Sequence, residues 1–124
     1  MRILAVLSLV CFLYGCGQKG SKLVSFREEI QPIVNNRCVK CHGSEQASGK
    51  VVLTSFENLM SSRTVYGKKP LVASGNPSES WLYILCATDQ PHFRMPPDTS
   101  HLTPLPKKEL ELLARWIVQG APNN

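Results

Sequence analysis

The sequence predicts an all-α domain of three to five helices, and three observations lead to this fold class. Residues 25–28 and 54–57 each have the form of a capping box, in which a hydroxyl residue is followed three places later by Glu. Apolar residues then recur at the spacing of one helix face. No stretch alternates long enough for a strand, and only residues 51–53 are expected to be extended. The chain has 124 residues, which fits one domain.

The first helix is expected to begin at Ser25, the N-cap, with Glu28 at the third helical position. Pro32 lies inside this segment and has no backbone N–H, so we expect a kink there. The apolar face of this helix consists of Phe26, Ile30, Ile33 and Val34.

Three further helices follow. The second is expected over residues 54–61, and the third over 76–86, where Asn76-Pro77 supplies an N-cap followed by proline. The last begins near Pro106 and ends at Gly120. The residues expected to face inward are Phe56, Leu59 and Met60, then Trp81, Leu82 and Leu85, then Leu110, Leu113, Ala114 and Ile117.

The first fifteen residues have the layout of a secretory signal, with Arg2 followed by an apolar run over 3–13. That run is shorter than the ~20 residues that a membrane-spanning helix needs. Residues 13–16, Leu-Tyr-Gly-Cys, resemble a bacterial lipobox, which implies that Cys16 becomes the acylated first residue of an exported chain. The absence of an acid at Gly17 then implies anchoring in the outer membrane.

The expected organisation is therefore a signal peptide over 1–15, a lipidated polar tether over 16–24 and a domain over 25–124. Loss of the signal removes Arg2 and no acid, so the net charge falls from +5 to +4. These charges are scattered, which fits an acidic redox partner or a negative membrane surface and not nucleic acid.

Cys38-Val39-Lys40-Cys41-His42 has the C-x-x-C-H pattern of covalent haem c attachment. Residues three and four apart share a helix face, so both thiols can reach the vinyl groups of one haem while His42 ligates its iron. A zinc site would need further ligands, and only Cys86, His92 and His101 are available. A thioredoxin-like motif would need a βαβ pattern, which the sequence does not have.

Met95 is the expected sixth iron ligand, because Pro96 and Pro97 stiffen the loop that follows it. His92 and His101 are alternative ligands, although both are expected to be exposed loop residues. Cys86 is expected to be a small buried apolar residue, with an intermolecular disulfide as the alternative. The sequence leaves the partners of the haem propionates open among Arg63, Tyr66, Lys68 and Lys69.

These motifs resemble class I cytochromes c, and more closely the haem-binding domains of planctomycete-type bacterial surface proteins. The resemblance covers about residues 25–122 and is strongest over 38–43, 74–77, 95–97 and 115–122. It implies a cytochrome c-like fold in which the first and last helices cross near the haem. We then expect Phe26 or Ile30 to meet Leu113 or Trp116, with Trp116 in the core.

The expected function is that of a mono-haem, exported and membrane-anchored carrier of single electrons. It would exchange electrons with redox partner proteins and would have no small-molecule substrate. Whether it serves as a subunit of a redox enzyme stays open. Two alternatives are a haem enzyme or gas sensor with an open distal site, such as a peroxidase-like domain, and a haem-free structural lipoprotein.

Overall fold

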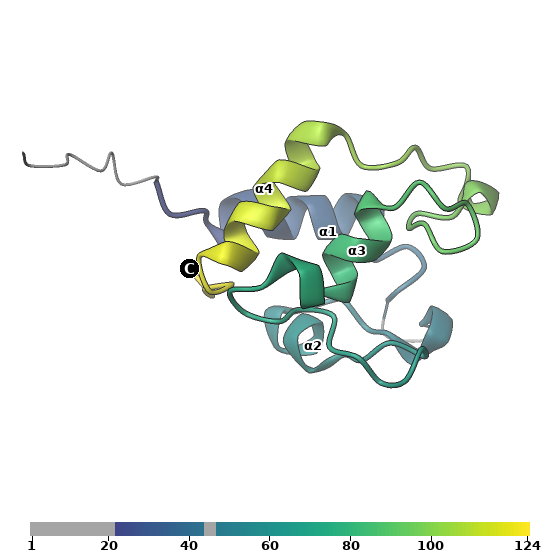
Figure 1. Ribbon diagram of the computed structural model, residues 1–124, viewed down its shortest axis with the longest axis horizontal. Helices are drawn as coiled ribbons and strands as arrows, with labels where there is room; N and C mark the ends of the chain where they lie inside the picture. Colours follow the sequence, from purple (N-terminus) through teal and green to yellow (C-terminus); the bar gives the residue numbers. More distant parts are fainter. Residues whose placement is uncertain (1–21, 44–46) are drawn as a thin grey trace, which may run out of the picture.

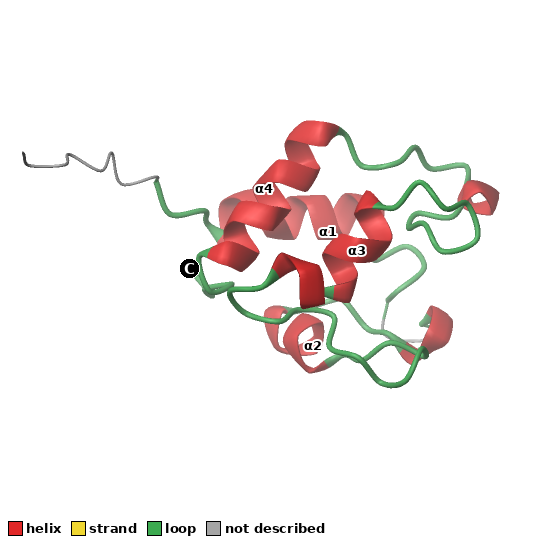
Figure 2. Ribbon diagram, in the orientation of Figure 1, coloured by secondary structure: helices red, strands yellow, loops and turns green. Residues whose placement is uncertain are grey.

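The fold was determined as a computed structural model that describes residues 22–43 and 47–124. Its α-helices are α1 (Gln31–Arg37), α2 (Phe56–Ser61), α3 (Trp81–Ala87) and α4 (Lys107–Val118). Loops join them, and the described residues contain no strand, only an isolated bridge between Arg63 and Pro70 (Figure 2). The predicted all-α class is confirmed. The signal, Cys16 and most of the tether lie outside the described residues.

The first helical segment starts as a π-helical turn, Phe26–Ile30, which runs directly into α1. Ser25 caps it as predicted, because its Oγ accepts the Glu28 N–H at 3.2 Å. The carboxylate that accepts a hydrogen bond from the Ser25 N–H in return is not that of Glu28, as the sequence predicted, but that of Glu29. The Ser25 N–H donates to Oε2 of Glu29 at 2.9 Å, since the wide π turn brings the next residue back over the cap.

At Pro32 the structure changes helix type where the sequence predicted a kink. The segment before it is π-helical, and α1 begins at Gln31 with Pro32 at its second position. The Gln31 N–H still donates to the Phe26 carbonyl of the π-helical turn, so the change of helix type falls at the residue that has no N–H to donate.

The predicted third helix is divided in two. A 3-10 turn, Pro77–Glu79, precedes α3, and Ser80 lies between them in an extended conformation. Ser80 is fully buried, and its Oγ accepts the Ala73 N–H at 2.9 Å and lies 2.8 Å from the Asn76 carbonyl oxygen. The side chain therefore satisfies the backbone of the preceding loop, and this contact holds the loop against the start of α3.

The second helix begins one residue later than the capping box predicted. Ser55, not Thr54, is the N-cap of α2, and its Oγ accepts the Asn58 N–H at 3.1 Å. Leu59 is buried and Phe56 and Met60 pack against the core, which confirms the predicted inner face.

The core forms where α4 packs against the π-helical turn, with α2 on the other side (Figure 1). Trp116 is fully buried, and its ring centroid lies 5.6 Å from that of Phe26, so the predicted contact is confirmed. The chain end closes the same region, because Oδ1 of Asn124 accepts the Phe26 N–H at 2.8 Å. None of the helices described is long and apolar enough to cross a membrane.

Replacing Trp116 by Ala is expected to lower the free energy of unfolding by roughly 3–5 kcal/mol, because it leaves a large cavity at the helix crossing. Val118 lies on the same helix and is 61% exposed, so Val118→Ala is the matched control, expected within about 0.5 kcal/mol of wild type. Urea unfolding of the two variants measures the difference. Similar losses in both would contradict the assignment of Trp116 to the core.

Candidate cofactor site

A cavity of about 170 Å³, open to solvent on one side, lies beyond the end of α1. Its walls come from five segments: the turn after α1, the loop over 48–53, the segment over 64–71, one face of α3 and the loop over 95–102. Most of the lining is apolar, including Val51, Leu53, Leu71, Leu82 and Leu85. A concave site with mostly apolar walls and a few polar side chains is typical of a site for a small-molecule cofactor.

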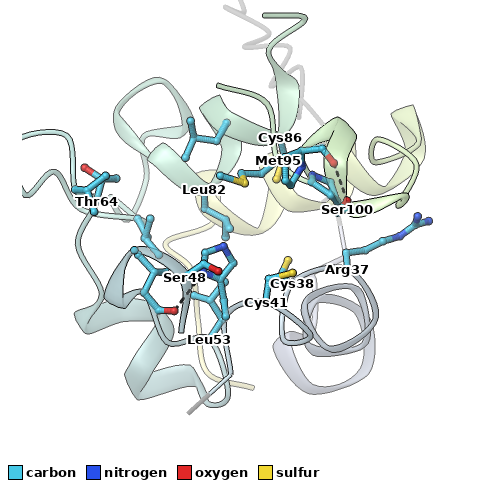
Figure 3. Close-up of a pocket in the computed structure, with 18 of the residues that line it drawn as sticks. Arg37, Cys38, Cys41, Ser48, Leu53, Thr64, Leu82, Cys86, Met95 and Ser100 are labelled. Atoms are coloured by element: carbon cyan, nitrogen blue, oxygen red, sulfur yellow. Dashed lines mark hydrogen bonds between the residues drawn. The ribbon is translucent and has the colours of Figure 1, made fainter. Parts of the chain in front are cut away.

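Cys38, Cys41 and His42 all line this cavity. The Cys38 N–H donates to the Val34 carbonyl at 2.9 Å, so Cys38 is still held by the end of α1. The N–H groups of Cys41 and His42 then both donate to the Cys38 carbonyl, at 3.1 and 2.9 Å, which closes a tight turn. This turn directs both thiols to the same side, as Figure 3 shows for Cys38 and Cys41. The structure thus brings together the three residues of the motif.

The loop after the motif fixes the imidazole of His42. Its Nδ1 lies 3.2 Å from the Val51 carbonyl oxygen, which can only accept, so Nδ1 carries the proton and Nε2 keeps its lone pair. The backbone adds two more bonds, from the Leu53 N–H to the His42 carbonyl and from the Ser48 N–H to the Cys41 carbonyl, both 2.9 Å. A backbone acceptor on the second nitrogen is typical of a histidine that ligates a metal. No pattern in the sequence pointed to the part played by the Val51 carbonyl.

The other wall of the cavity carries Met95 and Cys86, which lie close together across from Cys38 and Cys41 (Figure 3). The Met95 N–H donates to the Leu85 carbonyl at 2.8 Å, which ties its loop to α3. Arg94 pairs with Asp98 and braces the same loop. Met95 is therefore held on a stiff segment with its side chain at the cavity, as its predicted role requires.

The remaining histidines do not reach the site. His92 and His101 are exposed and do not line the cavity, so neither competes with Met95. Within the described ranges no group of three or more His, Cys, Asp or Glu side chains could hold a metal ion, and all three cysteines there are free. These observations remove the support for a zinc site.

Arg37 is a lining residue that the sequence did not single out. Its guanidinium pairs with Glu109 of α4 at 3.3 Å and donates to Oγ1 of Thr103 at 3.1 Å. Burial raises the pKa of the Cys38 thiol to about 11, and the neighbouring Arg37 charge opposes that rise. The ion pair thus joins the end of α1 to α4 beside the first cysteine of the motif.

Cys86 is buried as predicted, at 5% exposure, and burial raises the pKa of its thiol to about 12. At pH 8 we therefore expect Cys86 to react with iodoacetamide at least a hundredfold more slowly in the folded protein than in urea, because the thiolate is the reactive form. Non-reducing electrophoresis should show only monomer. Mass spectrometry measures the alkylation, and rapid labelling of folded protein or a disulfide-linked dimer would contradict this picture.

The helices and this site define the class of the protein, a small helical domain of the c-type cytochromes. Residues 38–99 match the family model for planctomycete cytochrome C, a range that includes both the C-x-x-C-H motif and Met95. The chain belongs to this family. Membership implies binding of haem c, and the cavity fits such a group because its apolar walls carry two thiols, an imidazole with a free Nε2 and a thioether. Comparisons with curated proteins and with solved structures found no significant match.

Proposed function

We propose that the chain binds one haem through Cys38, Cys41, His42 and Met95 and carries single electrons. The observation that carries this proposal is the composition of one cavity, with two thiols and an imidazole on one wall and a thioether on the other. When bound, the haem supplies an iron that gains and loses one electron.

Covalent attachment uses the two thiols. Each thiol would add across one vinyl group, with sulfur bonding to one carbon and the hydrogen to the other, so that no oxidant or reductant would be consumed. Cys38 and Cys41 lie one helical turn apart and face the same cavity, which allows both additions to a single porphyrin.

His42 and Met95 would ligate the iron from the two facing walls of the cavity. Nε2 of His42 is free to ligate, because Nδ1 is held by the Val51 carbonyl. The bond from Met95 to Leu85 and the Arg94–Asp98 pair keep the opposite loop in place in both redox states. The mostly apolar walls leave few polar groups between them that would reorient when an electron is gained or lost.

An electron-carrying role is favoured over catalysis by what lines the cavity. Among the described residues that line it there is no Asp or Glu, and the only histidine is His42. A peroxidase-like reaction needs a general base beside the open iron position, and the described walls offer none.

Export and anchoring complete the proposal. Residues 1–15 act as a signal, Cys16 carries the lipid, and residues 16–24 tether the domain to a membrane on its periplasmic side. Haem c is attached on that side of the bacterial membrane, so the leader and the C-x-x-C-H motif support the same location.

The test is expression of the full chain in a strain that carries the haem c maturation machinery. We expect a haem-staining band that persists in denaturing electrophoresis, one haem per chain by pyridine haemochrome assay, and a reversible one-electron titration. Labelling with radioactive palmitate tests Cys16, and Cys16→Ala is the control. Colourless, correctly exported protein would overturn the haem assignment.

A further inference from the structure

We propose that the two turns over 48–50 and 64–69 form the end of the cavity that binds the carboxylates of the cofactor. The inference rests on the proposed function and goes further by naming residues that recognise the propionates. On a haem the two propionates lie on the edge opposite the two vinyl groups. The thiols of Cys38 and Cys41 fix the vinyl edge, so the propionates must lie at the other end of the cavity.

Thr64 lies at that other end. In Figure 3 its side chain is separated from Cys38 and Cys41 by the width of the cavity. Thr64 is one of only two buried polar residues among those described, with 5% exposure. Its hydroxyl donates to the Tyr66 carbonyl at 3.2 Å, a long neutral bond that a carboxylate acceptor can replace with a stronger one.

Tyr66 lies beside it in the same turn. Its ring stacks on Trp81 with centroids 6.0 Å apart and meets Phe93 edge-on at 5.9 Å. These contacts fix the position of the ring, and Tyr66 lines the cavity with 46% of the residue exposed, so it lies at the rim.

The two turns adjoin each other and are rich in positive charge. A Cβ on Gly49 would lie 3.4 Å from Cγ1 of Val65, so the turns are in contact. They carry Lys50, Lys68 and Lys69, which are exposed and have no ion-pair partner among the described residues. None of the three lysines lines the cavity itself, but their positive charge lies on the same two turns as the buried hydroxyl of Thr64, which suits a pair of carboxylates at this end.

The other basic residues near the cavity are already engaged. Nη1 of Arg63 lies within 3.1 Å of the carbonyl oxygens of Met60, Ser61 and Ser62, so this side chain caps the end of α2. Arg37 pairs with Glu109 and directly precedes Cys38, which places it at the vinyl edge. The structure therefore favours Tyr66 and the lysines over Arg63, and it adds Thr64 and Lys50 to the set.

The first experiment compares the holoprotein with a Thr64→Val/Tyr66→Phe double variant by resonance Raman spectroscopy. Both substitutions keep the volume and remove the hydroxyls, so the fold should persist. We expect the propionate bending band to shift in the double variant and to stay unchanged in Arg37→Gln. A band that moves only in Arg37→Gln, or in neither variant, would overturn this assignment.

The second experiment removes the three charges together, as Lys50→Gln/Lys68→Gln/Lys69→Gln. The ferrous-to-ferric ratio at a fixed applied potential should fall on the order of tenfold, or 59 mV for one electron, because the ammonium groups favour the more negative ferrous state. The difference should shrink at ~0.5 M salt. Lys22→Gln/Lys107→Gln/Lys108→Gln removes the same charge elsewhere on the surface and should change the ratio less than twofold.

These outcomes separate the two proposals. Wild-type protein without bound haem would refute the proposed function. If haem is bound but the two lysine triple variants have equal reduction potentials, the lysines do not act on the propionates. That result would refute only this part of the inference and would leave the electron-carrying role intact.

Discussion

The Cys38→Ser/Cys41→Ser variant is expected to lose all covalent haem and most of its stability. The two thiols are the only covalent links that the motif offers, and serine cannot form thioethers with vinyl groups at a useful rate. Many core residues, among them Leu53, Leu71 and Leu82, also line the cavity, so they lose packing partners when the cofactor does not stay. We expect the free energy of unfolding to fall by several kcal/mol out of the ~5–15 typical of a domain.

A haem-staining gel after denaturation and thermal unfolding followed by circular dichroism measure the two effects. Cys86→Ser is the matched control, because it also removes a cavity-lining thiol. It should keep the covalent haem. Covalent haem in the double variant, or its loss in Cys86→Ser alone, would contradict the assignment of the thioether bonds to Cys38 and Cys41.

The Met95→Ala variant is expected to keep its covalent haem, to lose the near-infrared sulfur-to-iron band of the ferric protein and to bind carbon monoxide when reduced. Its reduction potential should fall by roughly 0.1–0.3 V, because a thioether opposite histidine favours ferrous iron. Flash photolysis and spectroelectrochemistry give the two readouts. The physical cause is the open sixth position on a wall that otherwise offers apolar groups, Cys86 and Ser100.

Two further variants make this experiment decisive. Met60 packs against the core and does not line the cavity, so Met60→Ala should lower stability without changing carbon monoxide binding. The Cys86 sulfur lies close to Met95 in Figure 3, so Met95→Ala/Cys86→Ala tests whether that thiol takes the open position. Carbon monoxide reactivity equal to wild type in both Met95 variants would show that Met95 is not the ligand.

Local patterns in the sequence predicted the helical class and the four residues proposed to hold the haem, Cys38, Cys41, His42 and Met95. Periodic apolar residues predicted the inner faces of α2 and α4, which Leu59, Leu113 and Ile117 confirm. The C-x-x-C-H motif and Met95 could be identified from the sequence, because the local spacing of the motif and the two prolines after Met95 decide what these residues can reach. The family match covers residues 38–99, a range that includes both the motif and Met95.

Tertiary structure decided the details that depend on residues far apart in the chain. The carbonyl that holds His42 belongs to Val51, and a backbone acceptor has no sequence signature. Ser80 is extended and not helical because its hydroxyl accepts the Ala73 N–H and donates to the Asn76 carbonyl of the preceding loop. Rules for helix starts do not describe such contacts.

Only the folded chain brings Gly49 against Val65 and Cys86 beside Met95, across separations that local patterns do not encode. The physical reason is that a motif fixes the chemistry a residue can perform. Packing of non-local segments fixes which side of the cavity that residue occupies, and so which part of a ligand it meets.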